Sequence, residues 1–152
     1  MFRKILKLLI FFTFINYAYT AKEGTGYNRG LKNNNISTIT KLLDNKKYKK
    51  AILLLKKEID KNELNAELYN LLGFAYRNSS NFDLSIESYK KALAIDPNHL
   101  GAHNYIGITY IKIGNVDKSI DHLQKLKELC KSKCKEYKSL KKELNNIIKD
   151  GN

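Results

Sequence analysis

The feature of this sequence that most limits its fold is an internal repeat with a period of about 34 residues. The repeat divides most of the chain into three units, Lys32–Asn65, Ala66–His99 and Leu100–Lys133. In the last two units Gly73 falls on Gly107, and Tyr76 falls on Tyr110. A period of this length is typical of arrays in which small supersecondary units stack on one another.

The middle unit carries two apolar stripes at helical spacing. The first comprises Leu68, Leu72, Ala75 and Tyr76, and the second comprises Phe82, Ile86, Tyr89 and Leu93. Recurrence at every third and fourth position places each stripe on one face of an amphipathic helix. The polar run Asn78–Asn81 separates the stripes, and Pro97 ends the second. With one proline in the whole chain, turn signals are too few for a β-sandwich. The sequence therefore predicts an all-α fold.

The period and the residue types resemble the tetratricopeptide repeat (TPR) family. The signature positions are Tyr69, Leu72, Gly73, Tyr76, Phe82, Tyr89, Ala92, Pro97, Gly107 and Tyr110. The resemblance runs from Lys32 to about Leu129 and implies a right-handed superhelix of about three helical hairpins. The sequence departs from the family at Ser85 and Ser119, where the family usually has alanine. The first unit also lacks the glycine, and the third unit lacks a final Asp-Pro.

Gly73 and Gly107 fall inside predicted helices, where glycine is about 1 kcal/mol less favourable than alanine. Glycine is explained there if a neighbouring helix passes too close for a Cβ atom. The resemblance assigns this role to both positions.

Residues 134–149 carry an apolar face suited to covering the last unit. That face comprises Tyr137, Leu140, Leu144, Ile147 and Ile148, with lysines and Glu143 on the other side. Each unit of a repeat array buries its apolar surface against its neighbours, so a terminal unit needs a cover. We expect a C-terminal capping helix here and a TPR domain over residues 33–150.

Cys130 and Cys134 are the two cysteines of the chain, and they lie between the third unit and the predicted cap. In an exported protein such a pair favours a structural disulfide. A bridge across a tight turn closes more easily than one within a straight helix. We expect it to replace the missing Asp-Pro and to hold the cap against the third unit. Free thiols, a redox-active pair and a metal site are the alternatives.

Residues 1–21 are typical of a secretory signal peptide. Basic residues precede a short apolar run, Leu8–Ile15, and small residues follow at Ala18 and Ala21. The run is shorter than the roughly 20 residues of a spanning helix. The sequence predicts cleavage, then a flexible linker over residues 22–32, and a periplasmic or secreted protein. A retained inner-membrane anchor over residues 5–19 is the alternative. The segment Leu129–Leu140 also resembles the tail of short exported TPR proteins of α-proteobacteria.

The TPR resemblance also implies a place for a partner, the groove lined by the first helix of each unit. The corresponding positions are Asn70, Phe74, Arg77, Asn78, Asn104, Ile108, Ile111 and Lys112. Apolar residues at these positions favour a partner that covers them. The alternative is that neighbouring helices or the cap cover them. A chaperone-type carboxylate clamp is not expected, because its asparagine positions hold Leu71 and Tyr105.

The remaining composition favours binding over catalysis. The formal charge of +13 comes from lysines spread over the whole chain, and export leaves little nucleic acid to bind, so we expect no nucleic-acid partner. No hydrolase or metalloprotease motif appears, and His99 and His103 are expected to pack rather than to bind metal. The sequence predicts a non-enzymatic adaptor or scaffold that binds another protein, without cofactor, metal or small-molecule substrate, and contacts a membrane only if the signal segment is retained. The alternatives are a structural or oligomerising envelope protein and a thiol-redox accessory protein that uses Cys130 and Cys134.

Overall fold

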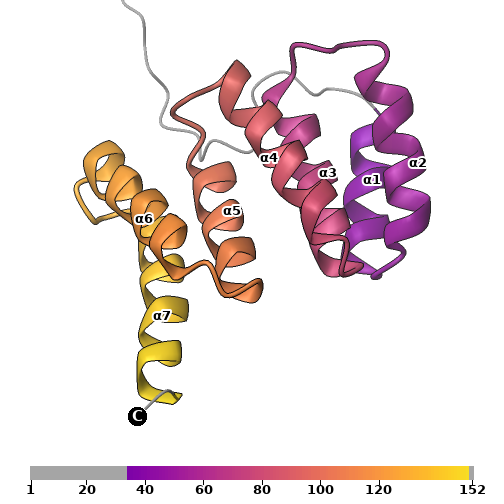
Figure 1. Cartoon of the computed structure of the whole chain (residues 1–152). Helices are drawn as coiled ribbons and strands as arrows, with labels where there is room; N and C mark the ends of the chain where they lie inside the picture. The colour runs from indigo at the N-terminus through magenta and orange to yellow at the C-terminus, as the bar shows by residue number, and fades with distance from the viewer. Residues whose placement is uncertain (1–33, 151–152) are drawn as a thin grey trace, which may run out of the picture.

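The computed structural model describes residues 34–150, and every regular element in this range is an α-helix. The helices are α1 Asn34–Asp44, α2 Tyr48–Ile59, α3 Ala66–Asn78, α4 Phe82–Ile95, α5 Leu100–Lys112, α6 Val116–Cys130 and α7 Lys135–Asp150. Figure 1 shows them as successive antiparallel pairs with α7 at the end. This confirms the predicted all-α TPR architecture. The predicted signal peptide, residues 1–21, and linker, residues 22–32, lie outside the described residues.

The helices follow the repeat period along the chain. The second helices of the three units begin at Tyr48, Phe82 and Val116, and each start lies one full period after the previous one. The first helices α3 and α5 begin at Ala66 and Leu100, which are also one period apart. Equal spacing means that each unit presents the same faces to the next, so one packing arrangement is repeated.

Polar side chains and one glycine set the helix ends. Oδ1 of Asn65 accepts hydrogen bonds from the backbone N–H groups of Glu67 and Leu68 at the start of α3. At the start of α5, Nδ1 of His99 accepts from the backbone N–H of Ala102. Such bonds satisfy N–H groups that have no partner inside the helix. After α5 the chain turns at Gly114, whose φ of +77° favours glycine.

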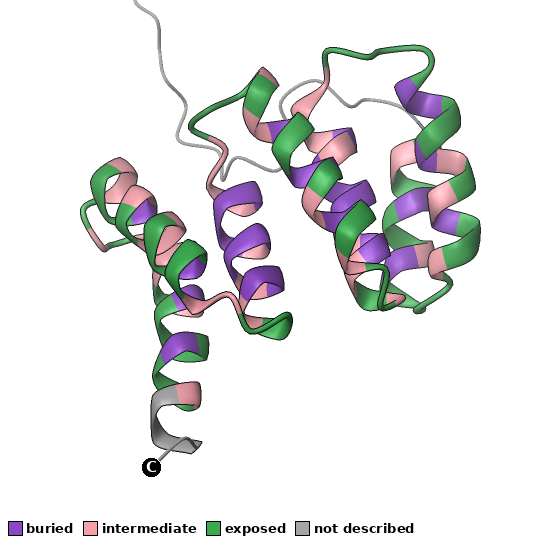
Figure 2. Ribbon diagram, in the orientation of Figure 1, coloured by how far each residue is buried: buried purple, intermediate pink, exposed green. Residues whose placement is uncertain are grey.

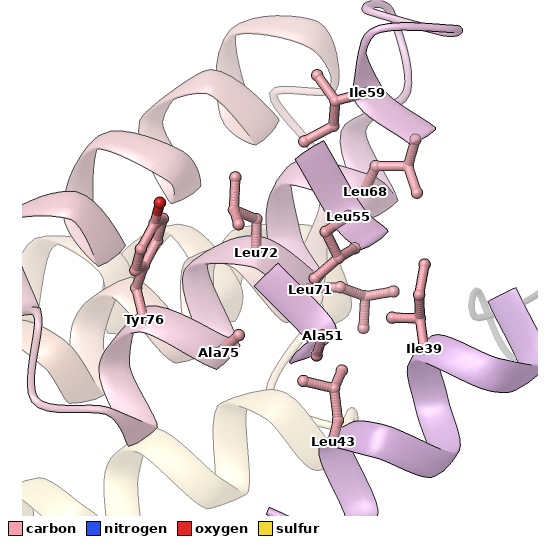
Figure 3. Packing of buried hydrophobic residues seen from close by; sticks show 10 residues of the cluster. All are labelled: Ile39, Leu43, Ala51, Leu55, Ile59, Leu68, Leu71, Leu72, Ala75 and Tyr76. Atoms are coloured by element: carbon pink, nitrogen blue, oxygen red, sulfur yellow. The ribbon is translucent and has the colours of Figure 1, made fainter. Parts of the chain in front are cut away.

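The largest buried cluster joins the first unit to α3. It comprises Ile39, Leu43, Ala51, Leu55, Ile59, Leu68, Leu71, Leu72, Ala75 and Tyr76 (Figure 3). A second cluster, of Tyr89, Ala92, Ala102, Ile106 and Tyr110, joins α4 to α5. In both, a second helix packs against the first helix of the following unit. Apolar side chains that one hairpin leaves uncovered are thus buried by the next.

The two glycines of the repeat signature, Gly73 and Gly107, face different neighbours. A Cβ at Gly73 would lie 2.6 Å from Cε1 of Tyr89, on the second helix of the same unit. A Cβ at Gly107 would lie 2.5 Å from Cδ2 of Leu140, on α7. Both spaces are too small for a side chain, which agrees with the expected close approach of a helix.

Helix α7 covers the last unit. Leu140 and Leu144 of α7 form a third buried cluster with Leu126 of α6. Extending the period places Leu140 on Ile106 and Leu144 on Tyr110, so α7 stands where the first helix of a fourth unit would stand. Figure 2 shows buried residues alternating with exposed ones along α7, and the buried Leu140 and Leu144 pack against residues of α5 and α6.

Candidate partner-binding face

Three side chains on α3 and α5 meet beside one another, and we call them the Arg77 site: Phe74, Arg77 and Tyr105. The guanidinium carbon of Arg77 lies 5.4 Å from the ring centroid of Phe74 and 5.4 Å from that of Tyr105. The two ring centroids are 5.5 Å apart. All three side chains are half-buried. Cation–π contacts at this distance hold the guanidinium in place.

Beneath this site the polar atoms are buried. Arg77 Nε and the Tyr89 hydroxyl are both inaccessible to solvent. Burial raises the pKa of Tyr89, and the positive charge of nearby Arg77 opposes that shift. No carboxylate in residues 35–147 forms an ion pair with Arg77. The arginine is therefore positioned by the two rings rather than by an acidic partner.

The structure divides the predicted groove residues into exposed and covered ones. Asn78 and Lys112 are exposed, and Phe74 and Arg77 are half-buried. Nδ2 of Asn78 donates to the backbone carbonyl of Phe74. These four residues lie at the carboxyl-terminal halves of α3 and α5, so accessible predicted positions gather towards one end of the two helices.

Of the other four predicted groove residues, Asn70 and Asn104 are buried, and Ile108 and Ile111 are half-buried. Asn70 is fully buried, and Asn104 is 5 % exposed. Ile108 and Ile111 pack against the cluster that includes Leu140 of α7. The cap thus contributes to covering these isoleucines, which was the alternative interpretation of their apolar character.

A buried polar network joins the starts of α3 and α5. One carboxylate oxygen of Glu67, Oε2, lies 3.0 Å from Nε2 of His99 and accepts from Nδ2 of Asn70 at 3.3 Å. Nδ1 of His99 is the α5 cap acceptor, so the neutral ring carries its proton on Nε2 and donates to Glu67. The network links two units and leaves His99 no free nitrogen for a metal.

The other two histidines form a pair between α5 and α6. Nδ1 of His103 lies 2.9 Å from Nδ1 of His122, and Nε2 of His103 lies 2.9 Å from the carbonyl oxygen of Pro97. Because a carbonyl only accepts, His103 carries its proton on Nε2, and His122 donates to it. Burial lowers the pKa of His103. Burial and then the adjacent His103 lower the pKa of His122 to about 4.

Cys130 and Cys134 are joined as a disulfide, with 5.7 Å between their Cα atoms. Cys130 ends α6 and Cys134 immediately precedes α7, so the pair spans the turn as expected. Lys131 and Ser132 within this turn adopt φ values of +50° and +64°. The third unit thus ends in a left-handed turn closed by the two sulfurs, where the middle unit ends at Asp96 and Pro97.

Metal sites, membrane-spanning helices and pockets were also compared with the predicted groove in the described part of the chain. Residues 34–150 contain no group of three or more side chains suited to hold a metal ion. Within the same range, none of the helices combines the length and apolar character needed to cross a membrane. An open hollow lies over the α5–α6 turn, and its lining residues Ile113–Asp117 include none of the predicted groove positions.

Sequence reasoning missed two residues of this region. Tyr105 was considered only as a wrong residue for a clamp, yet its ring contacts both Arg77 and Phe74. The sequence does not single out His122, which is half-buried and stacks on Tyr110 with 15° between the rings. The available sequence signal for Tyr105 is that it directly follows the predicted groove position Asn104, in the unit after the one that carries Arg77.

Comparisons with known proteins bear on the repeats. Residues 66–99 and 88–121 match models of the tetratricopeptide repeat. The chain is 37 % identical to the protein ycf37 of Guillardia theta over 91 residues, which are 56 % of this chain and 51 % of the relative. It therefore spans about half the length of that curated relative.

Two solved structures share the architecture. MamA from Desulfovibrio magneticus RS-1 superposes with a TM-score of 0.62 at 27 % identity, over 65 % of this chain and 56 % of that one. The first TPR of Spaghetti (RPAP3), solved with a peptide of HSP90 bound, superposes with a TM-score of 0.65 at 18 % identity, over 74 % and 89 %. The resemblance to exported α-proteobacterial proteins stays a prediction, since these comparisons do not test it. Residues 66–121 are thus tetratricopeptide repeats of the family matched by both models, set within an all-α fold of the TPR class.

Proposed function

We propose that this chain is an exported protein-interaction module, an adaptor or scaffold that binds a segment of a partner protein on its row of first helices. The observation that carries the proposal is the Arg77 site, an arginine held over two aromatic rings with no carboxylate partner among residues 35–147. Arginine and aromatic residues dominate the energetics of protein interfaces. The described residues offer no comparable constellation for catalysis.

The general role of the fold supports this interpretation. TPR proteins mediate contacts between proteins, and one structure of this fold holds a peptide of HSP90. A rigid row of helices can bind a segment with little loss of its own conformational freedom, which favours affinity.

The alternative of end-to-end stacking is less well supported. In a complete unit the glycine at position 73 or 107 admits a close neighbour, whereas the matching position of α7 is Lys141. Lys141 is exposed, and its ammonium lies 5.8 Å from the ring centroid of Tyr137 on the same helix. A lysine on the face where another helix would pack opposes continued stacking, because burying an unpaired charge is costly.

The thiol-redox alternative rests on the disulfide alone. The pair has the spacing C-x-x-x-C and joins two helix ends of the same domain. Redox dithiols usually have a C-x-x-C spacing near a βαβ unit, and residues 34–150 contain no strand. A role in holding the cap explains the bridge without further chemistry.

Site-specific crosslinking in intact cells tests the proposed function. A photoreactive residue replaces Asn78 on α3, and in a matched control it replaces Lys90, which is exposed on the second helix α4. We expect a defined partner adduct from position 78 and none from position 90. Equal adducts from both positions would contradict the proposal, and an adduct of two copies of this chain would favour the oligomerising alternative.

A further inference from the structure

We infer that Arg77 receives one acidic side chain, an aspartate or glutamate, from an extended segment of the partner. This inference rests on the proposed function, because it states the chemistry that the partner presents to the same face. The guanidinium is held by rings, belongs to a pair of helices with few acidic residues and lies in the middle of the row of helices, and each of these features bears on the ligand.

The rings fix the guanidinium before any ligand arrives. Phe74 belongs to α3 and Tyr105 to α5, so rings from two units lie within cation–π distance of one guanidinium. The Phe74 and Tyr105 rings are inclined by 59°. The guanidinium carbon and the two ring centroids are nearly equidistant, so both rings lie on the same side of the guanidinium. Its terminal N–H groups can bind a carboxylate as a fork from another side. Prior positioning reduces the entropy lost on binding.

The charges around the site favour an anion. Helix α5 contains no acidic residue, and the acidic residue of α3, Glu67, is engaged with His99 and Asn70. The titratable side chains of α3 and α5 that can carry full charge at pH 7 are thus Glu67, Arg77 and Lys112, which sum to +1. An acidic group of the partner would supply the missing counter-charge, and a charge-assisted hydrogen bond from a guanidinium is among the stronger ones in proteins.

The position of Arg77 favours a side-chain carboxylate over a chain terminus. Arg77 lies on α3 in contact with α5, the second and third of four successive first helices, α1, α3, α5 and α7 (Figure 1). A segment that follows this row continues on both sides of Arg77, so its own terminus does not fall there. The rings beside the guanidinium also suit the methylene groups of a glutamate or an apolar neighbour.

Three short probe peptides test the inference on the full chain. All are fluorescein-labelled hexapeptides: one of glutamine with two central glutamates and an amidated terminus, one of glutamine alone with an amidated terminus, and one of glutamine alone with a free terminal carboxylate. Fluorescence polarisation at low salt measures their binding. We expect the glutamate peptide to bind about tenfold more tightly than either glutamine peptide.

Matched variants separate a specific contact from general charge attraction. Arg77→Gln should lower affinity for the glutamate peptide about tenfold, and Arg77→Lys should restore part of it. Lys90→Gln, which removes the same charge from an exposed position of the second helix α4, should change it less than about twofold. Circular dichroism and the melting temperature of each variant report whether it is folded. Equal losses in Arg77→Gln and Lys90→Gln would overturn the inference.

Other outcomes also decide the question. Equal affinity for all three peptides, or binding of none, overturns the inference. Tighter binding of the glutamine peptide with a free carboxylate also overturns it, because Arg77 would then bind a chain terminus rather than a side chain. The crosslink at position 78 separates this failure from that of the proposed function. If the parent protein and Arg77→Gln capture the partner equally, the proposed partner binding stands, but the inference that Arg77 binds an acidic side chain fails.

Discussion

The ring of Tyr89 fills the space over Gly73, so that a Cβ at this glycine would lie within 2.6 to 2.9 Å of three ring atoms. Tyr89 is fully buried. The contact joins the two helices of the middle unit, so a side chain added at position 73 would meet a buried ring.

We predict that Gly73→Leu unfolds the array or nearly does so. Overpacking typically costs about 1–3 kcal/mol, and an array of three units has few neighbours to compensate. Ala94→Leu, at an exposed position of α4, is the matched control and should leave the protein folded. Thermal unfolding followed by circular dichroism measures both, and an unchanged melting temperature for Gly73→Leu would contradict the packing described.

Leu140→Ala should loosen the cap and the third unit. Leu140 is fully buried against Leu126 and over Gly107, and truncation of a buried leucine costs about 2–5 kcal/mol. Lys142→Ala on the exposed side of α7 should cost much less. In Leu140→Ala, amide hydrogen exchange should become faster in the part of the chain that follows Leu100. A rise confined to α1 and α2 would show that α7 does not stabilise the third unit.

Because of the pair formed by His103 and His122, we predict that the free energy of unfolding decreases as the pH falls below neutral. The lowered pKa of His122, about 4 against an ordinary 6.5, means that the unfolded chain binds a proton that the folded chain excludes. Stability is therefore complete above pH 6.5 and is lost as pH falls towards 4. The loss at pH 5 should be less than about 2 kcal/mol, because His122 is partly exposed and solvent screens its charge.

The control for this prediction is His122→Asn, which should remove most of the loss between about pH 6.5 and 4.5. The carboxyl of Glu58 titrates lower: hydrogen bonding from Lys61 lowers its pKa below 4.5, so its contribution is lost at more acidic pH. Denaturant unfolding at several pH values separates the two windows. Equal stability at pH 7 and pH 5 in the parent protein would mean that the histidines are solvated.

Cys130 and Cys134 should be oxidised in the native protein, and reduction should free α7 without unfolding the first two units. The loop they close is short, so the gain in stability lies at the low end of the range of about 0–5 kcal/mol. Reduction should raise hydrogen exchange mainly over residues 126–147. The double variant with serine at both positions should behave like the reduced protein.

Two results would contradict this. Alkylation of both cysteines in the unreduced native protein would show that the bridge is absent. An equal rise in exchange over residues 41–55 and 126–147 after reduction would show that the cap is not the element held by the disulfide.

The mature protein should begin between Ala18 and Lys22. A basic start and a short apolar run motivate this prediction. Intact mass and N-terminal sequencing of protein recovered from the exporting cell measure the cleaved bond. Recovery of exported protein that still starts at Met1 would favour the membrane-anchored alternative.

The sequence by itself determined the helix pairs and their succession. Apolar residues recurring at every third and fourth position specify amphipathic helices locally, and the repeat period requires the second helices to start at Tyr48, Phe82 and Val116 as they do. It also indicated that Gly73 and Gly107 lie at close approaches, because glycine inside a helix is unfavourable unless space demands it.

Only the tertiary structure decided which side chains meet. The period pairs Gly73 with Tyr89 and would pair Gly107 with Leu123, but the atoms nearest Gly107 belong to Leu140, since the cap packs directly on α5. The Arg77 site likewise depends on the distance between α3 and α5, which brings Tyr105 beside Phe74. Contacts between units depend on how helices cross, and that geometry is set by the packing of all side chains together, which local spacing does not contain.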